Sequence, residues 1–277
     1  MPSASAAPQV PPLQSEHVVD ESYAGRYRTD AIVLNFGPTD ARACFGPMTA
    51  SVPPHCLSPG TSGWLELPGW SWKGLVPAGG STLYGAFALV GHYGGSTFTL
   101  TEPAKPSTSA PLWLGRRPPM SSPCPEPTGG WTPVDPSRAT ADSWSLAAEH
   151  AQRETGFGAS WIDERDPNGV PDNRLPDPKT FVLNVSTTGD LAAMQTAVRQ
   201  IWGGALCVSR AAYTGVALAN AQRALTNRPG ILQIYLDGRT SQLEVTVIRA
   251  TVQRQRELDR EFGPGTIRQY GALAPLD

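Results

Sequence analysis

Residues 104–140 form a proline-rich stretch that constrains the fold of this chain more than any other feature. Proline donates no backbone hydrogen bond and its ring fixes φ, so such a stretch forms neither a helix nor a central strand. Strand patterns dominate before it, whereas residues 141–277 combine helix and strand patterns. The sequence therefore predicts an α+β protein in which a linker joins a β-rich domain, residues 21–103, to an α/β domain. Residues 1–20, rich in Ala, Ser and Pro, are predicted to be a disordered tether.

The front part is predicted to be a small all-β barrel or sandwich. DAIVLNF has the composition of a strand, and YGAFALVGHYGGSTFTLTE has the alternation of a hairpin that turns at its Gly-Gly pair. Four glycines lie between Gly85 and Gly95, and a strongly curved sheet needs residues without Cβ at its bends.

The rear part is predicted to contain a ferredoxin-like domain. From residue 205 the pattern is strand, helix, strand, strand, helix, strand, which is the βαββαβ unit, and an extra strand and helix precede it at residues 180–202. A helix through Leu258 is expected to end at Gly263, where Gly-Pro-Gly stops it.

Charge and hydropathy exclude some partners. The net charge is −2 with no clustered positive surface, so nucleic acid is not an expected partner. No stretch approaches the roughly 20 apolar residues that span a bilayer, so no transmembrane segment is expected. The first residues lack the basic and apolar regions of a signal peptide and have the composition of a tether that follows one, so no leader is visible in this sequence.

Four cysteines indicate the compartment. Cys44 and Cys56 close a loop stiffened by two prolines, and a disulfide there would stabilise the fold by about 3 kcal/mol. Free thiols or a metal or redox pair are the alternatives, although neither C-x-x-C nor a zinc-knuckle spacing is present. Of the three possible connectivities we favour Cys44–Cys56 with Cys124–Cys207, which predicts an oxidising compartment and an exported protein.

Several segments occur in a specific order: CFGPMTASVPPHC, LPGWSW, YGAFALVGHYGGSTFTLTE, PCPEPTGGWTPVDP, ALCVSRA and FGPGTIRQYGALAP. Together, over about residues 23 to 276, they resemble a set of uncharacterised exported proteins of actinobacteria, secreted or lipoprotein-like. The resemblance implies an extracytoplasmic or lipid-anchored protein with a β-rich front half and an α/β rear half. It implies no activity.

Catalytic motifs give little support for an enzyme. The four histidines, His17, His55, His92 and His150, do not suggest a triad, and no G-x-S-x-G elbow is present. G-x-G-x-x-G and the P-loop are absent as well. The sequence therefore favours a protein without catalysis and leaves the enzyme question open.

Three tryptophans, Trp64, Trp70 and Trp72, lie within nine residues. Exposed ring faces in such a cluster would bind a saccharide, whereas buried rings would complete the core of a small β-domain. The sequence favours the core role and keeps ligand binding as the alternative.

An acidic stretch is the only candidate metal site. Its ligands would be Glu164, Asp166, Asn168 and Asp172, whose spacing is similar to the start of a calcium loop. The twelfth position, where a bidentate Glu belongs, is Leu175, and a solvated polar loop is the competing interpretation. No cofactor is expected unless Ca²⁺ binds here.

The helix RQRELDREFG carries alternating charges, which suit either a partner-binding face or a solvated surface. The sequence as a whole predicts a non-catalytic binding or structural protein, extracellular or associated with the cell envelope, whose partner is an envelope polymer or a protein. The alternative is a metal-assisted hydrolase or calcium-dependent binding protein that uses residues 163–172.

Overall fold

The structure is a computed structural model that describes residues 15–35, 40–45, 56, 63–72, 83–109, 120–164, 176–226 and 228–276. The chain divides into two compact units. Unit 1 comprises residues 1–13, 117–221 and 236–243, and unit 2 comprises residues 14–116, 222–235 and 244–277. No helix of the described residues is both long enough and apolar enough to cross a membrane.

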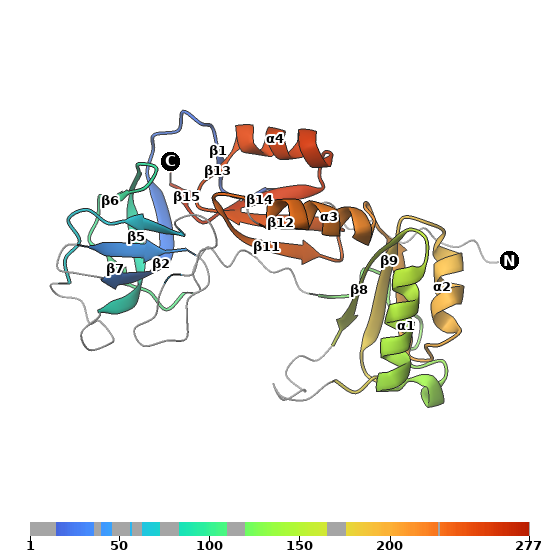
Figure 1. The fold of residues 1–277 in the computed structure, drawn as a ribbon. Coiled ribbons are helices and arrows are strands. Elements are labelled where there is room, and N and C mark those ends of the chain that lie inside the picture. The colour runs from blue at the N-terminus through green and yellow to red at the C-terminus, as the bar shows by residue number, and fades with distance from the viewer. Residues whose placement is uncertain are drawn as a thin grey trace. The chain divides into compact units, whose positions relative to one another are not determined.

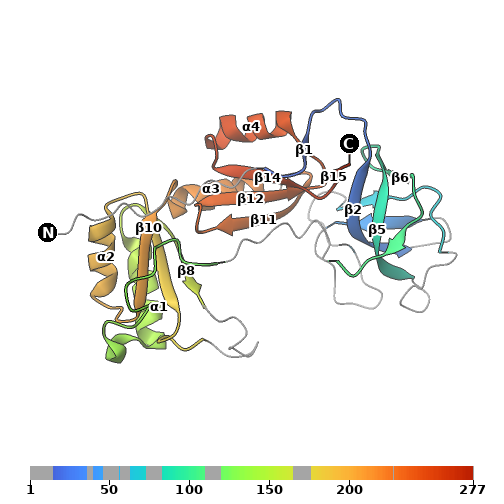
Figure 2. The ribbon, with the colours of Figure 1, turned by 180° about the vertical axis from the view of Figure 1, so that it is seen from behind.

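Unit 2 contains the predicted β-rich part, a curled antiparallel sheet (Figures 1 and 2). Its main path runs β4-β3-β2-β5-β6, with β15 beside β2 and β7 beside β5. The strands are β2 (Tyr27–Asn35), β3 (Ala41–Cys44), β4 (Trp64–Glu66), β5 (Tyr84–Tyr93), β6 (Phe98–Leu100), β7 (Lys105–Pro106) and β15 (Ala274–Pro275). The predicted hairpin is β5 and β6, so this part of the prediction is confirmed.

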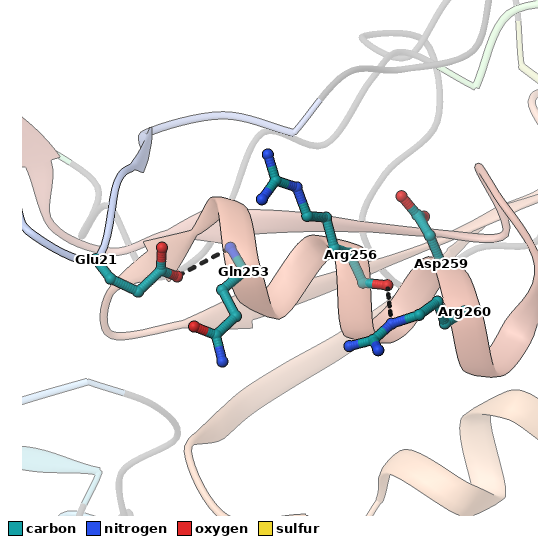
Figure 3. Close-up of a pocket in the computed structure, with 5 residues that line it drawn as sticks. All are labelled: Glu21, Gln253, Arg256, Asp259 and Arg260. Atoms are coloured by element: carbon teal, nitrogen blue, oxygen red, sulfur yellow. Dashed lines mark hydrogen bonds between the residues drawn. The ribbon is translucent and has the colours of Figure 1, made fainter.

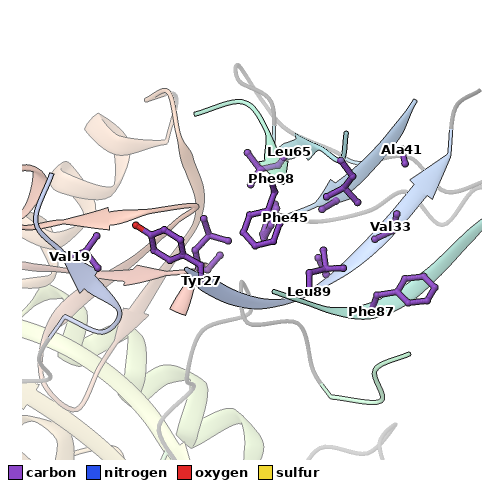
Figure 4. Close-up of a cluster of buried hydrophobic side chains, with 14 residues drawn as sticks. Val19, Tyr27, Val33, Ala41, Phe45, Leu65, Phe87, Leu89 and Phe98 are labelled. Atoms are coloured by element: carbon purple, nitrogen blue, oxygen red, sulfur yellow. The ribbon is translucent and has the colours of Figure 1, made fainter. Parts of the chain in front are cut away.

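Alternation along these strands forms one apolar core on the inner side of the curl (Figure 4). Phe87 and Leu89 of β5 are buried there with Phe98 of β6. Gly91 lies where β5 passes closest to β6, and a Cβ at this position would lie 2.2 Å from the carbonyl oxygen of Thr99. Glycine is therefore required here so that the two backbones can approach.

Unit 1 is built on the three-stranded sheet β10-β9-β8, with β8 (Phe157–Asp163), β9 (Val182–Thr187) and β10 (Ala205–Arg210). Helices α1 (Ala141–Arg153) and α2 (Leu191–Arg199) cover one face. Thr140 caps α1 through a capping box, and Asp190 caps α2 by accepting a hydrogen bond from the Ala193 amide at 2.8 Å.

A short 3-10 helix, η2 (Pro136–Arg138), precedes α1 and is capped by Asp135. The Asp135 carboxylate accepts hydrogen bonds from the Ser137 hydroxyl and from Nε of Arg138, at 2.6 and 2.7 Å. These bonds, that of Ser137 first, lower the pKa of Asp135 to about 2.

A third sheet has the order β11-β12-β14. The remaining elements are β1 (Val18–Val19), α3 (Gly215–Leu225), β11 (Ile231–Asp237), β12 (Gln242–Val247), β13 (Ala250–Thr251), α4 (Val252–Phe262) and β14 (Ile267–Gly271). Two side chains on the neighbouring strands β12 and β14, Glu244 and Arg268, form an ion pair at 2.7 Å, and each is only 5% exposed. Helix α4 ends at Gly263 as predicted, with φ of 93°.

The ferredoxin-like arrangement is not confirmed. That unit would place strand 205–210 in one sheet with the three strands that follow it. Instead, all six residues of β10 pair in parallel with β9, and β11, β12 and β14 form a sheet of their own. The physical reason is local: a single short helix, α2, connects β9 to β10, and strands joined in this way usually pair with each other. Strand β9, which the sequence analysis placed outside the βαββαβ unit, therefore lies beside β10.

The last part of the predicted tether, residues 15–20, pairs with strands of unit 2. In β1, Val18 and Val19 pair in parallel with Ala250 and Thr251 of β13. Glu16 forms a further parallel bridge with Tyr270 of β14. Residues 15–20 are therefore an edge segment of unit 2 rather than a disordered tether.

Candidate binding site along helix α4

Helix α4 is the most polar helix of the structure in its described residues, and Leu258 is its single buried side chain. Thr251 caps the helix by accepting a hydrogen bond from the Arg254 amide at 3.3 Å. Leu258 anchors the helix on unit 2, so the other turns present charged side chains outward.

A second segment, far away in sequence, completes a groove on this helix. Glu21 follows β1 and accepts a hydrogen bond from the Gln253 amide at 2.9 Å, across 232 positions of sequence. The pKa of Glu21 is lowered, first by a hydrogen bond from the Thr251 side chain and then by the hydrogen bond from the Gln253 amide and the charge of Arg249. Arg249 also ties this segment down, because its Nη2 donates to the backbone oxygens of Asp20 and Glu21, at 3.0 Å each.

The groove has a volume of about 630 Å³ and is open to solvent (Figure 3). Its lining residues, all within unit 2, are Glu21, Gln253, Arg256, Asp259 and Arg260.

Acidic and basic side chains of the groove are engaged differently. Asp259 accepts a hydrogen bond from Nε2 of Gln255 at 3.0 Å, and Glu21 holds the start of α4. Arg260 donates from Nε to the Arg256 carbonyl oxygen at 3.3 Å. The exposed guanidinium group of Arg256 donates to no acceptor in the described part of the chain. Both carboxylates therefore maintain the structure, whereas guanidinium donors remain available to a ligand.

The carboxylates on the charged face of α4 are engaged by residues other than the arginines of this helix. Glu261 pairs with Arg228 near the end of α3, and Glu257 accepts a hydrogen bond from Nε2 of Gln253 at 2.9 Å. Among the described residues, no arginine of α4 forms an ion pair with an acidic residue of the same helix. The arginines of α4 are thus not engaged by carboxylates of their own helix, and the partner-binding interpretation of the charge pattern stays a prediction.

The tryptophan cluster packs on the core of the β-rich sheet. The rings of Trp70 and Trp72 lie 5.3 Å apart with planes at 80°, and both meet Phe87 edge to face. The Arg42 guanidinium covers the ring of Trp64 at 5.0 Å. This geometry completes a core more readily than it offers one flat platform, and saccharide binding by these residues stays a prediction.

Both predicted disulfides, Cys44–Cys56 and Cys124–Cys207, are present, with Cα–Cα distances of 5.7 and 5.8 Å. The second one attaches the linker to unit 1, where Cys124 and Trp131 pack on Cys207. That contact lies on the face of the sheet opposite the helices.

The acidic stretch is described only at its start. Glu164 is exposed just after β8, whereas Asp166, Asn168 and Asp172 lie outside the described residues. Within the described residues, no three His, Cys, Asp or Glu side chains gather as a metal site would require.

Sequence reasoning found Arg256, Asp259 and Arg260 as a charged face but missed Glu21. Nothing in the local pattern of residues 15–21 connects them to a helix 232 positions away. The groove is thus a product of tertiary structure.

No protein-family model matches the chain, and no curated protein has a significantly similar sequence. The resemblance to exported proteins of actinobacteria therefore stays a prediction.

Proposed function

We propose that this chain is a non-catalytic binding protein of the cell envelope and that it holds a partner protein in the groove between Glu21 and α4. Two disulfides fit an oxidising, non-cytoplasmic compartment. The groove carries the proposal, because it is prearranged by internal hydrogen bonds and leaves guanidinium donors for a ligand.

Charge defines the kind of partner. Arg256 and Arg260 lie one helical turn apart and both are exposed. An arginine fork pairs best with carboxylates, since two parallel N–H donors match the two oxygens. The fitting partner is therefore a protein segment that presents acidic side chains, with Gln253 as an additional amide contact at one end of the groove.

Site-specific photocrosslinking tests this proposal. A photoreactive amino acid in place of Gln253 should form an adduct with an envelope protein under illumination. Arg256→Glu together with Arg260→Glu should abolish the adduct, because both charges are reversed. Arg153→Glu is the matched control, since Arg153 is an exposed helical arginine of unit 1 whose partner is Glu149. The protein that carries Arg153→Glu should still form the adduct at position 253.

Two results would reject the proposal. An adduct that survives the double charge reversal would show that the groove arginines do not recognise the partner. An adduct that a peptidoglycan hydrolase digests and a protease leaves intact would assign the groove to an envelope polymer.

A further inference from the structure

A second, more enclosed cavity lies on another face of α4, within unit 2. Its volume is about 130 Å³, room for about four water molecules at about 30 Å³ each. Four aliphatic side chains from α3, β11, β12 and α4 contribute its apolar wall: Leu225, Ile231, Val245 and Leu258. Because helix positions advance by about 100°, the cavity residues and the groove residues of α4 lie on different faces of the helix, and the two faces adjoin where Gln253 donates a hydrogen bond to Glu257.

The rim of the cavity contains one satisfied ion pair. Arg228 donates from both terminal nitrogens to the two carboxylate oxygens of Glu261, one bond measuring 2.7 Å. The guanidinium of Arg228 also lies 5.2 Å from the ring centre of Phe262. Hydrogen bonding to Glu261 raises the pKa of Arg228, and the same contact lowers the pKa of Glu261. Both residues line the cavity, and because each satisfies the other they have little hydrogen-bonding capacity left for a ligand.

Arg254 is the other arginine of the rim, and its situation differs. It is half-buried, and its guanidinium donates from Nη2 to the backbone oxygen of Pro229 at 3.0 Å. A carbonyl is a neutral acceptor, so this hydrogen bond supplies no countercharge. Glu257, which also lines the cavity, offsets part of the charge of Arg254 and is itself hydrogen-bonded to Gln253, whereas the charge of Arg228 acts in the opposite direction. Burial lowers the pKa of Arg254, which means that its charged form lacks full compensation.

An anion bound at Arg254 would supply that compensation, and the aliphatic wall would bury a short hydrocarbon attached to it. Pockets for small ligands combine such an apolar wall with a few polar groups that fix orientation. We propose that this cavity binds an aliphatic carboxylate, with the carboxylate on Arg254 and a short branched chain against Ile231 and Leu258.

The small volume limits the ligand to acids of the size of isobutyrate or isovalerate. The same chemistry is presented by the C-terminal carboxylate of a peptide that ends in Val or Leu. A two-point contact from guanidinium to carboxylate suits either source.

Titrations of the full-length chain followed by amide NMR test the proposal. Isovalerate should shift amides of α4 and β11 and bind at least tenfold more tightly than 3-methylbutan-1-ol, which keeps the chain and lacks the charge. Arg254→Gln should weaken isovalerate at least tenfold. Arg256→Gln, the same replacement on the groove side of α4, should change the affinity less than twofold.

A second variant covers the case in which Arg254→Gln unfolds unit 2. Ile231→Phe fills the cavity while leaving the arginine in place, and it should also weaken isovalerate at least tenfold. Equal affinity for the acid and the alcohol, equal loss in Arg254→Gln and Arg256→Gln, or unchanged binding by Ile231→Phe would each overturn the proposal.

A peptide ending in Gly-Gly-Val, compared as free acid and as amide, separates the two sources. Tighter binding of the peptide acid than of isovalerate supports a chain terminus as the ligand, and tighter binding of isovalerate supports a free acid. A peptide amide that binds as well as the peptide acid would contradict recognition of the carboxylate. This test does not depend on the proposed function, because none of its variants except the control lines the groove.

Discussion

The two disulfides should contribute unequally to stability, and each should act on its own unit. Cys124 and Cys207 are 83 positions apart and lie in unit 1, whereas Cys44 and Cys56 are 12 positions apart and lie in unit 2. In the chain-entropy treatment, a closed loop of n residues lowers the entropy of the unfolded chain by 2.1 + 1.5R ln n cal/mol/K. At 25 °C this is about 4.5 kcal/mol for the longer loop and about 2.8 kcal/mol for the shorter one.

Paired alanine variants isolate this loop term. Cys207 and Cys44 are both only 1% exposed, so the cost of the cavity that alanine leaves is similar in the two variants. Cys124→Ala with Cys207→Ala should therefore destabilise its unit by about 1.7 kcal/mol more than Cys44→Ala with Cys56→Ala destabilises the other.

Native-state hydrogen exchange measures both effects in one experiment, because it reports opening free energies segment by segment. The first variant should lose protection in β9 and β10, with β2 and β5 unchanged, and the second should show the reverse. A larger loss from removal of the short loop than from removal of the long one would refute the entropic reasoning. So would a loss of protection in the unit that keeps its disulfide.

Three further results are expected. Gly91→Ala should destabilise unit 2 by about 1–3 kcal/mol in urea, since its Cβ would meet backbone of β6, and a neutral effect would contradict the close approach. The carboxyl carbon of Asp135 should titrate near pH 2 when it is followed by NMR. Because the pKa of Asp135 is lower in the folded than in the unfolded state, this group stabilises the fold above about pH 4 and loses its effect as the pH falls to about 2. A titration midpoint near pH 4 would contradict the capping bonds. Glu244→Gln should lower the stability of the fold by about 3–5 kcal/mol, because it leaves Arg268 buried without its ion pair. The double variant Glu244→Leu with Arg268→Met should lower it far less. A double variant that loses as much stability as its two single variants together would argue against the ion pair.

Local signals predicted the elements whose causes are local. The hairpin of β5 and β6 follows from alternation around a Gly-Gly turn, and the end of α4 follows from Gly263. The two cysteine pairs followed from spacing and from the number of possible connectivities.

Partners distant in sequence could not be predicted in this way. Periodicity identifies residues 205–210 as a strand, but it does not say which strand lies beside it, so the sheet of β8, β9 and β10 was not foreseen. Glu21 reaches α4 for the same reason, since nothing in a local window encodes a contact across 232 positions. The buried pair of Glu244 and Arg268 lies in strands that would otherwise be expected to alternate with solvent.

The pairing of β2 with β15 determines when unit 2 can finish folding. Tyr27 and Arg28 meet Pro275 and Ala274, so the first long strand of the chain needs the last strand as a neighbour. The paired residues are 246 and 248 positions apart, and synthesis at about 5–20 residues per second takes about 12–50 s to supply that strand. Throughout this interval β2 can pair with β3 and β5, but Tyr27 and Arg28 lack the neighbour that β15 supplies, so the start of β2 is the last part of this sheet to close.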